Sequence, residues 1–141
     1  MRRRISIRVP DPNSAREFRH SIANLSWVVF GLVELLAEDA RLGPEAAHIA
    51  ALSQATEALR TLVAPLFEGP PDAHGGPEFS RVGRVVEHPL AQIALAADAW
   101  LADPAVQPRV AQSLSAIGNA ARDLGSAFRG WIAAHPGDVS E

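Results

Sequence analysis

Apolar residues in segment 18–36 recur alternately four and three positions apart, and this spacing constrains the fold more than any other feature of the chain. The positions that follow it are Phe18, Ile22, Leu25, Val29, Leu32 and Leu36. Because an α-helix turns about once every 3.6 residues, these side chains form one apolar seam that faces a partner helix. The sequence therefore predicts a long amphipathic helix that begins near residue 13 and ends near residue 40.

A second stripe of the same helix consists mostly of residues that suit chemistry or docking. It contains His20, Asn24, Trp27, Gly31 and Glu34, again at alternating spacings of four and three. A solvent-facing histidine followed by an amide, a large aromatic ring and a glycine is more typical of a reaction or docking surface than of an ordinary solvated face. We take His20 as the candidate catalytic residue and Asn24 as its support. The candidate contacts to a partner are Arg19, Ser21, Trp27, Gly31 and Glu34.

The rest of the chain predicts three more helices. Segment 44–67 follows a turn that contains Gly43, and segment 103–134 has the most regular apolar spacing of all. Segment 78–102 includes Pro89, which must kink or break a helix because proline lacks the N–H group. Glycine and proline dominate segment 68–77, so we expect a linker there.

Four long helices with short or glycine-rich connections predict an all-α fold, an antiparallel four-helix bundle made of two helical hairpins. The first hairpin covers residues 13–67 and the second covers residues 78–134. A short N-terminal arm, residues 1–12, precedes them, and the alternation in segment 5–9 is that of an extended strand. With 141 residues, the chain is expected to form a single domain, 1–141, around one core.

The two hairpins share a weak sequence similarity. The segment from His20 to Leu25 resembles the segment from His88 to Ile93, and each precedes an apolar helix, a turn and a second helix. One hypothesis is that a helical hairpin was duplicated. In that case the two hairpins of one chain pair with each other as the hairpins of two chains would in a dimer.

Composition restricts the classes of function. The chain has no cysteine, which removes disulfides, thiolate metal sites and cysteine nucleophiles and fits a reducing cytoplasm. The formal net charge of −3 argues against a general nucleic-acid binder, because such proteins gain affinity by neutralising phosphates. No uninterrupted apolar run reaches the roughly eighteen residues that a membrane span needs. We expect a cytoplasmic protein whose partners are proteins, not nucleic acids or membranes.

Two segments fit the Glu-x-x-His pattern of di-iron helix bundles: Glu17 to His20 and Glu45 to His48. If the chain turns near residue 42, the two histidines differ in level by about fifteen residues, or roughly 20 Å at 1.5 Å per residue. That separation is several times the span of a dinuclear site, so we expect no metal. The sequence also lacks a Gly-x-Ser-x-Gly elbow and a phosphate-binding glycine loop, and no cofactor is expected.

Phosphoryl transfer through histidine suits these residues better. A neutral imidazole is a competent nucleophile near pH 7, and it needs no activating triad when the incoming phosphoryl group is already activated. The side chain must project from its helix to enter the active site of another protein, as His20 is expected to do. Asn24 lies one turn along, where its amide could hydrogen-bond the ring or a phosphoryl oxygen.

The same residues carry a resemblance. The segment from His20 to Leu25, followed by the segment from Val28 to Leu36, resembles the H-box helix of the dimerisation and histidine-phosphotransfer domain of two-component sensor kinases. The resemblance covers about residues 16–68. It implies that His20 is a phosphoacceptor, that Asn24 supports it, and that the partner is a receiver domain or a kinase. Ser21 stands where the family usually has an acidic residue, and no α/β ATP-binding domain follows in this sequence. The resemblance therefore implies a phosphotransfer intermediate at most, without its own ATP site.

Two other classes of function remain open. A non-catalytic scaffold, such as a homodimer, could use the face around Trp27, because an exposed tryptophan beside Gly31 is typical of interaction surfaces. A small-molecule-binding bundle could instead enclose a cavity lined by Phe30, Trp100 and Phe128. Structural roles are expected for His48 and His88, and core or core-edge positions for Trp100 and Trp131.

Overall fold

A computed structural model describes residues 12–40, 43, 45–70 and 73–139 of the chain. Within these residues the fold is all-α, as the sequence predicts: it contains five α-helices and two 3₁₀ helices but no strand. The helices are α1 (Pro12–Ala40), α2 (Ala46–Val63), η1 (Ala64–Phe67), α3 (Gly76–Val85), α4 (Glu87–Leu101), α5 (Pro108–Ala134) and η2 (Pro136–Val139). Apart from Pro12, the predicted N-terminal arm lies outside the described residues.

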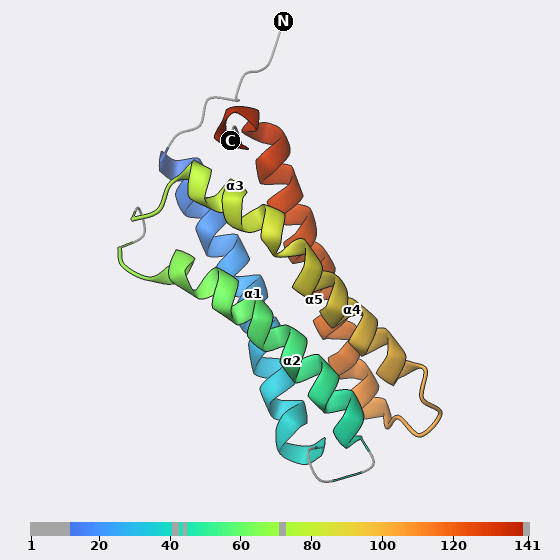
Figure 1. Cartoon of the computed structure of the whole chain (residues 1–141). Helices are drawn as coiled ribbons and strands as arrows, with labels where there is room; N and C mark the ends of the chain where they lie inside the picture. Colours follow the sequence, from blue (N-terminus) through green and yellow to red (C-terminus); the bar gives the residue numbers. More distant parts are fainter. Residues whose placement is uncertain (1–11, 41–42, 44, 71–72, 140–141) are drawn as a thin grey trace, which may run out of the picture.

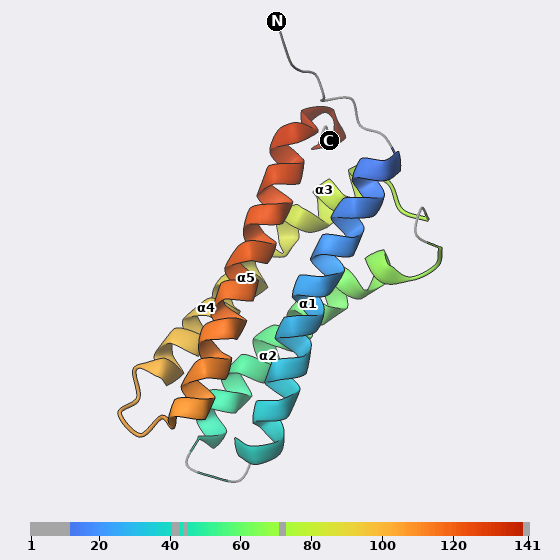
Figure 2. The ribbon, with the colours of Figure 1, turned by 180° about the vertical axis from the view of Figure 1, so that it is seen from behind.

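The long helices form two neighbouring pairs that pack against each other. Helix α1 lies beside α2, and α4 lies beside α5 (Figure 1). The pairs meet where α1 packs on α5 and where α2 packs on α4, and the view from behind shows α5 along α1 (Figure 2). Helix α3 packs mainly on α5, at the end of the molecule where α1 begins (Figure 1).

The predicted helix 78–102 is two helices in the structure. The N–H of Val86 donates to the carbonyl of Val82, and the N–H of Leu90 donates to the carbonyl of Val86, each at 3.0 Å. Pro89 has no N–H group, and its ring would clash with a carbonyl four residues earlier in a continuous helix. The chain therefore breaks at Val86, and Pro89 lies in the first turn of α4, where a missing donor costs little.

The last long helix is shorter than predicted. Residues 103–134 were expected to be helical, but α5 begins at Pro108. Asp103 accounts for the difference, because its Oδ1 accepts a hydrogen bond from the N–H of Ala105 at 2.9 Å. This bond stabilises a turn in place of the first helical residues. Helix α3 begins at Gly76, whereas the linker was predicted to continue to residue 77.

The core is built from the predicted seams. The buried side chains of α1 include Ile22, Val29 and Leu36, and the partly buried Phe18 completes this side of the helix. Phe18 stacks on Trp131 with ring centroids 4.7 Å apart, so the first helix is tied to the end of α5. The other helices contribute further buried apolar residues to this core, among them Leu52, Leu59, Leu66, Val86, Ile93, Ala97, Trp100, Leu114, Ile117, Ala121, Leu124, Phe128 and Trp131.

Helix α1 is the one helix in the described part of the chain that is long and apolar enough, over part of its length, to pass a test for a membrane span. Its segment Ala15–Glu38 has a length and an average composition that would allow it to cross a membrane, although no uninterrupted apolar run exists. Core helices of soluble proteins and signal sequences pass the same test. Here Ile22, Val29 and Leu36 are buried against the other helices, while Trp27 and Leu35 are exposed.

Candidate functional site

The second stripe predicted for α1 lies on the exposed side of the helix. His20, Asn24, Trp27, Gly31 and Glu34 are all exposed. The stripe is held in place by the opposite side of the same helix, whose seam is packed against α5 and α2. A rigid helix therefore presents His20 to solvent well away from either helix end.

Asn24 holds the ring of His20. The Nδ2 atom of Asn24 lies 3.3 Å from Nε2 of His20, one turn away on the helix. An amide has both a donor and an acceptor, so two arrangements satisfy this contact. In one, Asn24 donates to Nε2 and the ring proton is on Nδ1. With the amide turned over, the N–H at Nε2 donates to the amide oxygen, and the free lone pair is on Nδ1.

A groove of about 830 Å³ opens beside His20. Its lining combines charged and polar side chains with the aromatic rings of Trp27 and Phe67, and Phe67 is contributed by η1. The lining residues are Arg16, Glu17, Arg19, His20, Ser21, Ala23, Trp27 and Phe67. Arg16, Glu17, Ala23 and Phe67 are not among the site residues predicted from the sequence. Spacings of four and three residues from His20 could have indicated Arg16 and Glu17, whereas Phe67 comes from a distant segment and leaves no such signal.

Arg19 makes contacts within the chain that its sequence did not reveal. Its Nε donates to the carbonyl of Leu66 at 2.9 Å, and its NH2 group donates to the carbonyl of Gly69 at 3.3 Å. These bonds tie α1 to the end of η1, which carries Phe67. Arg19 therefore has a structural role at the edge of the groove, in addition to the predicted place among the partner contacts.

Trp27 forms the apolar end of the site. Its side chain is 55% exposed, and its ring lies 5.6 Å from that of Phe30 and 5.8 Å from that of Phe67. Val28 and Leu35 extend this apolar surface along α1. No atom would lie within 4 Å of a Cβ added at Gly31, so the middle of the surface is open to close approach.

The far end of the stripe is linked to α2. Glu34 pairs with Arg60 at 3.1 Å, and the guanidinium of Arg60 also lies 4.3 Å from the ring centroid of Phe30. Arg60 forms a further ion pair with Glu57 at 3.2 Å. Exposed pairs of this kind contribute little each, about 0–1 kcal/mol, but together they fix the orientation of Arg60.

Four of the chain's five histidines are hydrogen-bonded to other described groups, His20 to Asn24 among them. His48 bonds Asp103 at 3.1 Å and stacks on Trp100, which agrees with the expected structural role. The N–H of Ala105 and the bond to His48 lower the pKa of the Asp103 carboxyl below its ordinary value. His74 bonds Glu78, and His135 bonds the carbonyl of Trp131. Of the five, His20 and His88 are exposed, and the other three are half-buried.

The two Glu-x-x-His segments do not meet. His48 lies in the first turn of α2, whereas His20 lines the groove with Phe67 beyond the other end of that helix. Across the described residues, no group of three or more His, Asp or Glu side chains is placed to hold a metal ion.

No family model, curated protein or solved structure matches this chain. The assignment of a function therefore depends on the geometry of the surfaces themselves. Phe30, Trp100 and Phe128, the residues of the small-molecule hypothesis, are buried in the core, and none of them lines the groove beside His20.

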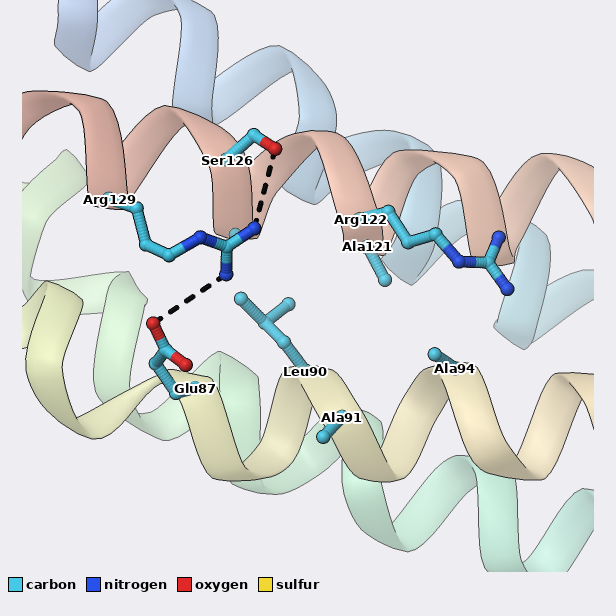
Figure 3. A pocket seen from close by; sticks show the side chains of 9 residues that line it. Glu87, Leu90, Ala91, Ala94, Ala121, Arg122, Ser126 and Arg129 are labelled. Atoms are coloured by element: carbon cyan, nitrogen blue, oxygen red, sulfur yellow. Dashed lines mark hydrogen bonds and ion pairs between the residues drawn. The ribbon is translucent and has the colours of Figure 1, made fainter.

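A second groove, of about 370 Å³, runs between α4 and α5 (Figure 3). Its charged groups are engaged with one another: Arg129 pairs with Glu87 at 3.6 Å and bonds Ser126, as Figure 3 shows. Arg122 pairs with Asp98 of α4 at 3.3 Å. These contacts link the two helices, and they leave the His20 groove as the stronger candidate for chemistry.

Proposed function

We propose that this chain is a histidine-phosphotransfer protein, in which His20 accepts a phosphoryl group and passes it to a protein partner. The observation that carries the proposal is the setting of His20. The ring is exposed on a rigid helix, its orientation is held by Asn24, and it borders a groove with a cationic side chain one turn away, at Arg16. The resemblance to the H-box helix supports the same role for the same two residues.

The residues can perform the transfer without a bound cofactor. The lone pair of the ring nitrogen that Asn24 does not engage attacks phosphorus, and the bond from phosphorus to the donor's oxygen breaks with its electrons on that oxygen. The ring proton stays on the other nitrogen, so the product is an imidazolium that carries the phosphoryl group. Arg16 can pair with the phosphoryl oxygens, because guanidinium groups bind phosphate strongly.

Transfer onward requires a partner that can reach His20. The apolar surface of Trp27, Val28 and Leu35 continues from the groove along α1 and would take the partner's apolar contacts. By the family resemblance, that partner is a receiver domain with an acceptor aspartate, or a kinase. The absence of cysteine is consistent with a cytoplasmic setting.

The fold supports the proposal at the level of architecture. We interpret the arrangement as an antiparallel four-helix bundle whose third helix is divided into α3 and α4. Such a bundle supplies a stiff wall for an exposed histidine, because each helix buries a continuous apolar seam. The Gly/Pro-rich segment 68–77 would then separate the two hairpins of a single domain.

Labelling with phosphoramidate, a small histidine-directed phosphoryl donor, tests the chemistry. The protein should gain acid-labile phosphate that maps to His20, and His20→Ala should lose that label while remaining folded by circular dichroism. Asn24→Ala should slow the labelling of His20, since the ring would no longer be oriented. Absence of label at His20 in the folded protein would refute the proposal.

A second candidate function is non-catalytic docking, as in a homodimeric scaffold, and the exposure of Trp27, Val28 and Leu35 favours it. The two functions differ in their response to mutation. If phosphotransfer is the function, His20→Ala abolishes the relay and leaves partner binding largely intact. Trp27→Ala weakens docking under either function, and size-exclusion chromatography of the two variants shows whether this face joins two copies.

A further inference from the structure

The two halves of the molecule place their buried residues at equivalent positions. In α2 and η1 the buried positions are Ile49, Leu52, Ala55, Thr56, Leu59, Val63 and Leu66. The positions 65 residues later, all in α5, are also buried: Leu114, Ile117, Ala120, Ala121, Leu124, Phe128 and Trp131. Helices with the same pattern of buried positions present the same face to the core.

Helices α1 and α4 match in the same way, with an offset of 68 residues. The buried Ile22 and Val29 correspond to the buried Leu90 and Ala97. Four of the five members of the exposed stripe have an exposed counterpart of similar chemistry: His20, Asn24, Trp27 and Gly31 correspond to His88, Gln92, Leu95 and Ala99. The fifth, Glu34, corresponds to Ala102, just past the end of α4. The weak similarity around His20 and His88 thus extends to the burial and exposure of these positions, although the buried Phe30 corresponds to the exposed Asp98.

The packing has the same symmetry. Helix α1 packs on α5, and its counterpart α4 packs on α2, the counterpart of α5 (Figures 1 and 2). Each half is therefore a hairpin that uses the other half as its partner. An exposed stripe that belongs to one hairpin is expected on the other hairpin too.

The setting of His88 suits a ligand with hydrogen-bonding oxygens. His88 and Gln92 lie one turn apart on α4 and line a groove of about 290 Å³ between α2 and α4. Gln54 of α2 lines the same groove, so amide groups come from both helices, and the other lining residues are Ala51, Ala55, Ala58 and Pro89. Amide N–H groups can bond phosphoryl oxygens.

We propose that His88 is a second phosphoryl-accepting histidine, on the α4 face of the molecule. This inference depends on the proposed function of His20, because it extends the same chemistry to the equivalent position. A ring nitrogen of His88 attacks phosphorus, and the bond to the donor's leaving group breaks with its electron pair on that group. The ring proton remains on the other nitrogen. Gln92 is a positioning residue in this step, as Asn24 is for His20.

Phosphoramidate labelling of a set of variants tests the proposal. The set contains the wild-type protein, His20→Ala, His88→Ala and the double variant, all checked for folding by circular dichroism. Intact mass should show up to two acid-labile phosphoryl groups on the wild-type protein, one on each single variant and none at either site in the double variant. In the His20→Ala background, Gln92→Ala should slow the labelling of His88.

A matched control separates a site from mere exposure. Gln112→His, made in the double variant, places a histidine at an exposed position of α5 with an alanine, Ala116, one turn further on. His88 should be labelled several-fold faster than this control histidine. Equal rates, or no label at His88 beside a labelled His20, overturn the second site and leave the proposed function standing. Failure of both His20 and His88 to react refutes the proposed function and this inference together, whereas label on His88 alone refutes the role of His20 and supports that of His88.

Discussion

Arg19 provides a sharp test of how the groove beside His20 is built. Replacing it by methionine keeps most of the apolar stem and removes the guanidinium, so the bonds to the carbonyls of Leu66 and Gly69 are lost. The first bond is short, at 2.9 Å, and partly buried, whereas the second, at 3.3 Å, is exposed and therefore weaker. Because hydrogen bonds to charged groups contribute about 1.5–3 kcal/mol each when shielded, we expect Arg19→Met to lower the free energy of unfolding by about 2 kcal/mol.

The size of this effect is measurable. With an unfolding entropy of roughly 2 cal/mol/K per residue, a loss of about 2 kcal/mol lowers Tm by roughly 7 °C in a domain of this size. Urea unfolding followed by far-ultraviolet circular dichroism gives the same quantity as a shift in the midpoint at constant slope. The rate at which phosphoramidate labels His20 should change little in Arg19→Met, because Arg19 contributes to the groove through its hydrogen bonds to the end of η1.

Arg16→Met is the matched control. Arg16 lies in the adjacent turn, is exposed and makes neither of the bonds that Arg19 makes. Its replacement should change the free energy of unfolding by less than about 0.5 kcal/mol, as is usual for exposed positions. If Arg19→Met is no more destabilising than Arg16→Met, the bonds to η1 do not hold the groove together and this part of the account is wrong.

Two further predictions concern glycines and pH. Gly31→Ala and Gly130→Ala should each raise the free energy of unfolding by about 0.5–1 kcal/mol in thermal denaturation, since both glycines are exposed within helices and an added Cβ meets no atom within 4 Å. Gly83→Ala should lose this gain or reverse it, because its Cβ would lie 3.0 Å from Cδ1 of Phe128. The lowered pKa of Asp103 makes its carboxylate stabilising above its ordinary value of 3.8, and this stabilisation is lost as the pH falls through the lowered pKa. Asp103→Asn should therefore be less stable than the wild-type protein near neutral pH, with a difference that shrinks in strong acid; a difference that does not vary with pH would contradict the assignment.

The helical seams could be read from the sequence because they depend only on local spacing. Alternating steps of four and three residues placed Ile22 and Val29 in the core and His20 and Trp27 outside it, and the structure confirms both sides. The contact between Asn24 and His20 followed from the same rule, since residues four apart are neighbours on a helix.

The contacts between distant segments could not be read in this way. Arg19 and Leu66 are 47 positions apart, and no local pattern shows that the end of η1 returns to α1. For the same reason, no local pattern showed that Phe67 lines the site beside His20. The break at Val86 was only half predicted, because Pro89 shows that a helix must kink or break but not that the next helix begins two residues before the proline.

The most direct test of the central claim is the rate at which phosphoramidate labels His20 in the folded protein, compared with the same histidine after unfolding in urea. If the fold orients the ring through Asn24 and the groove supplies Arg16, the folded protein should react several-fold faster at His20 and give an acid-labile product. An equal or slower rate in the folded protein would show that His20 is an ordinary exposed histidine, and it would contradict the phosphotransfer account.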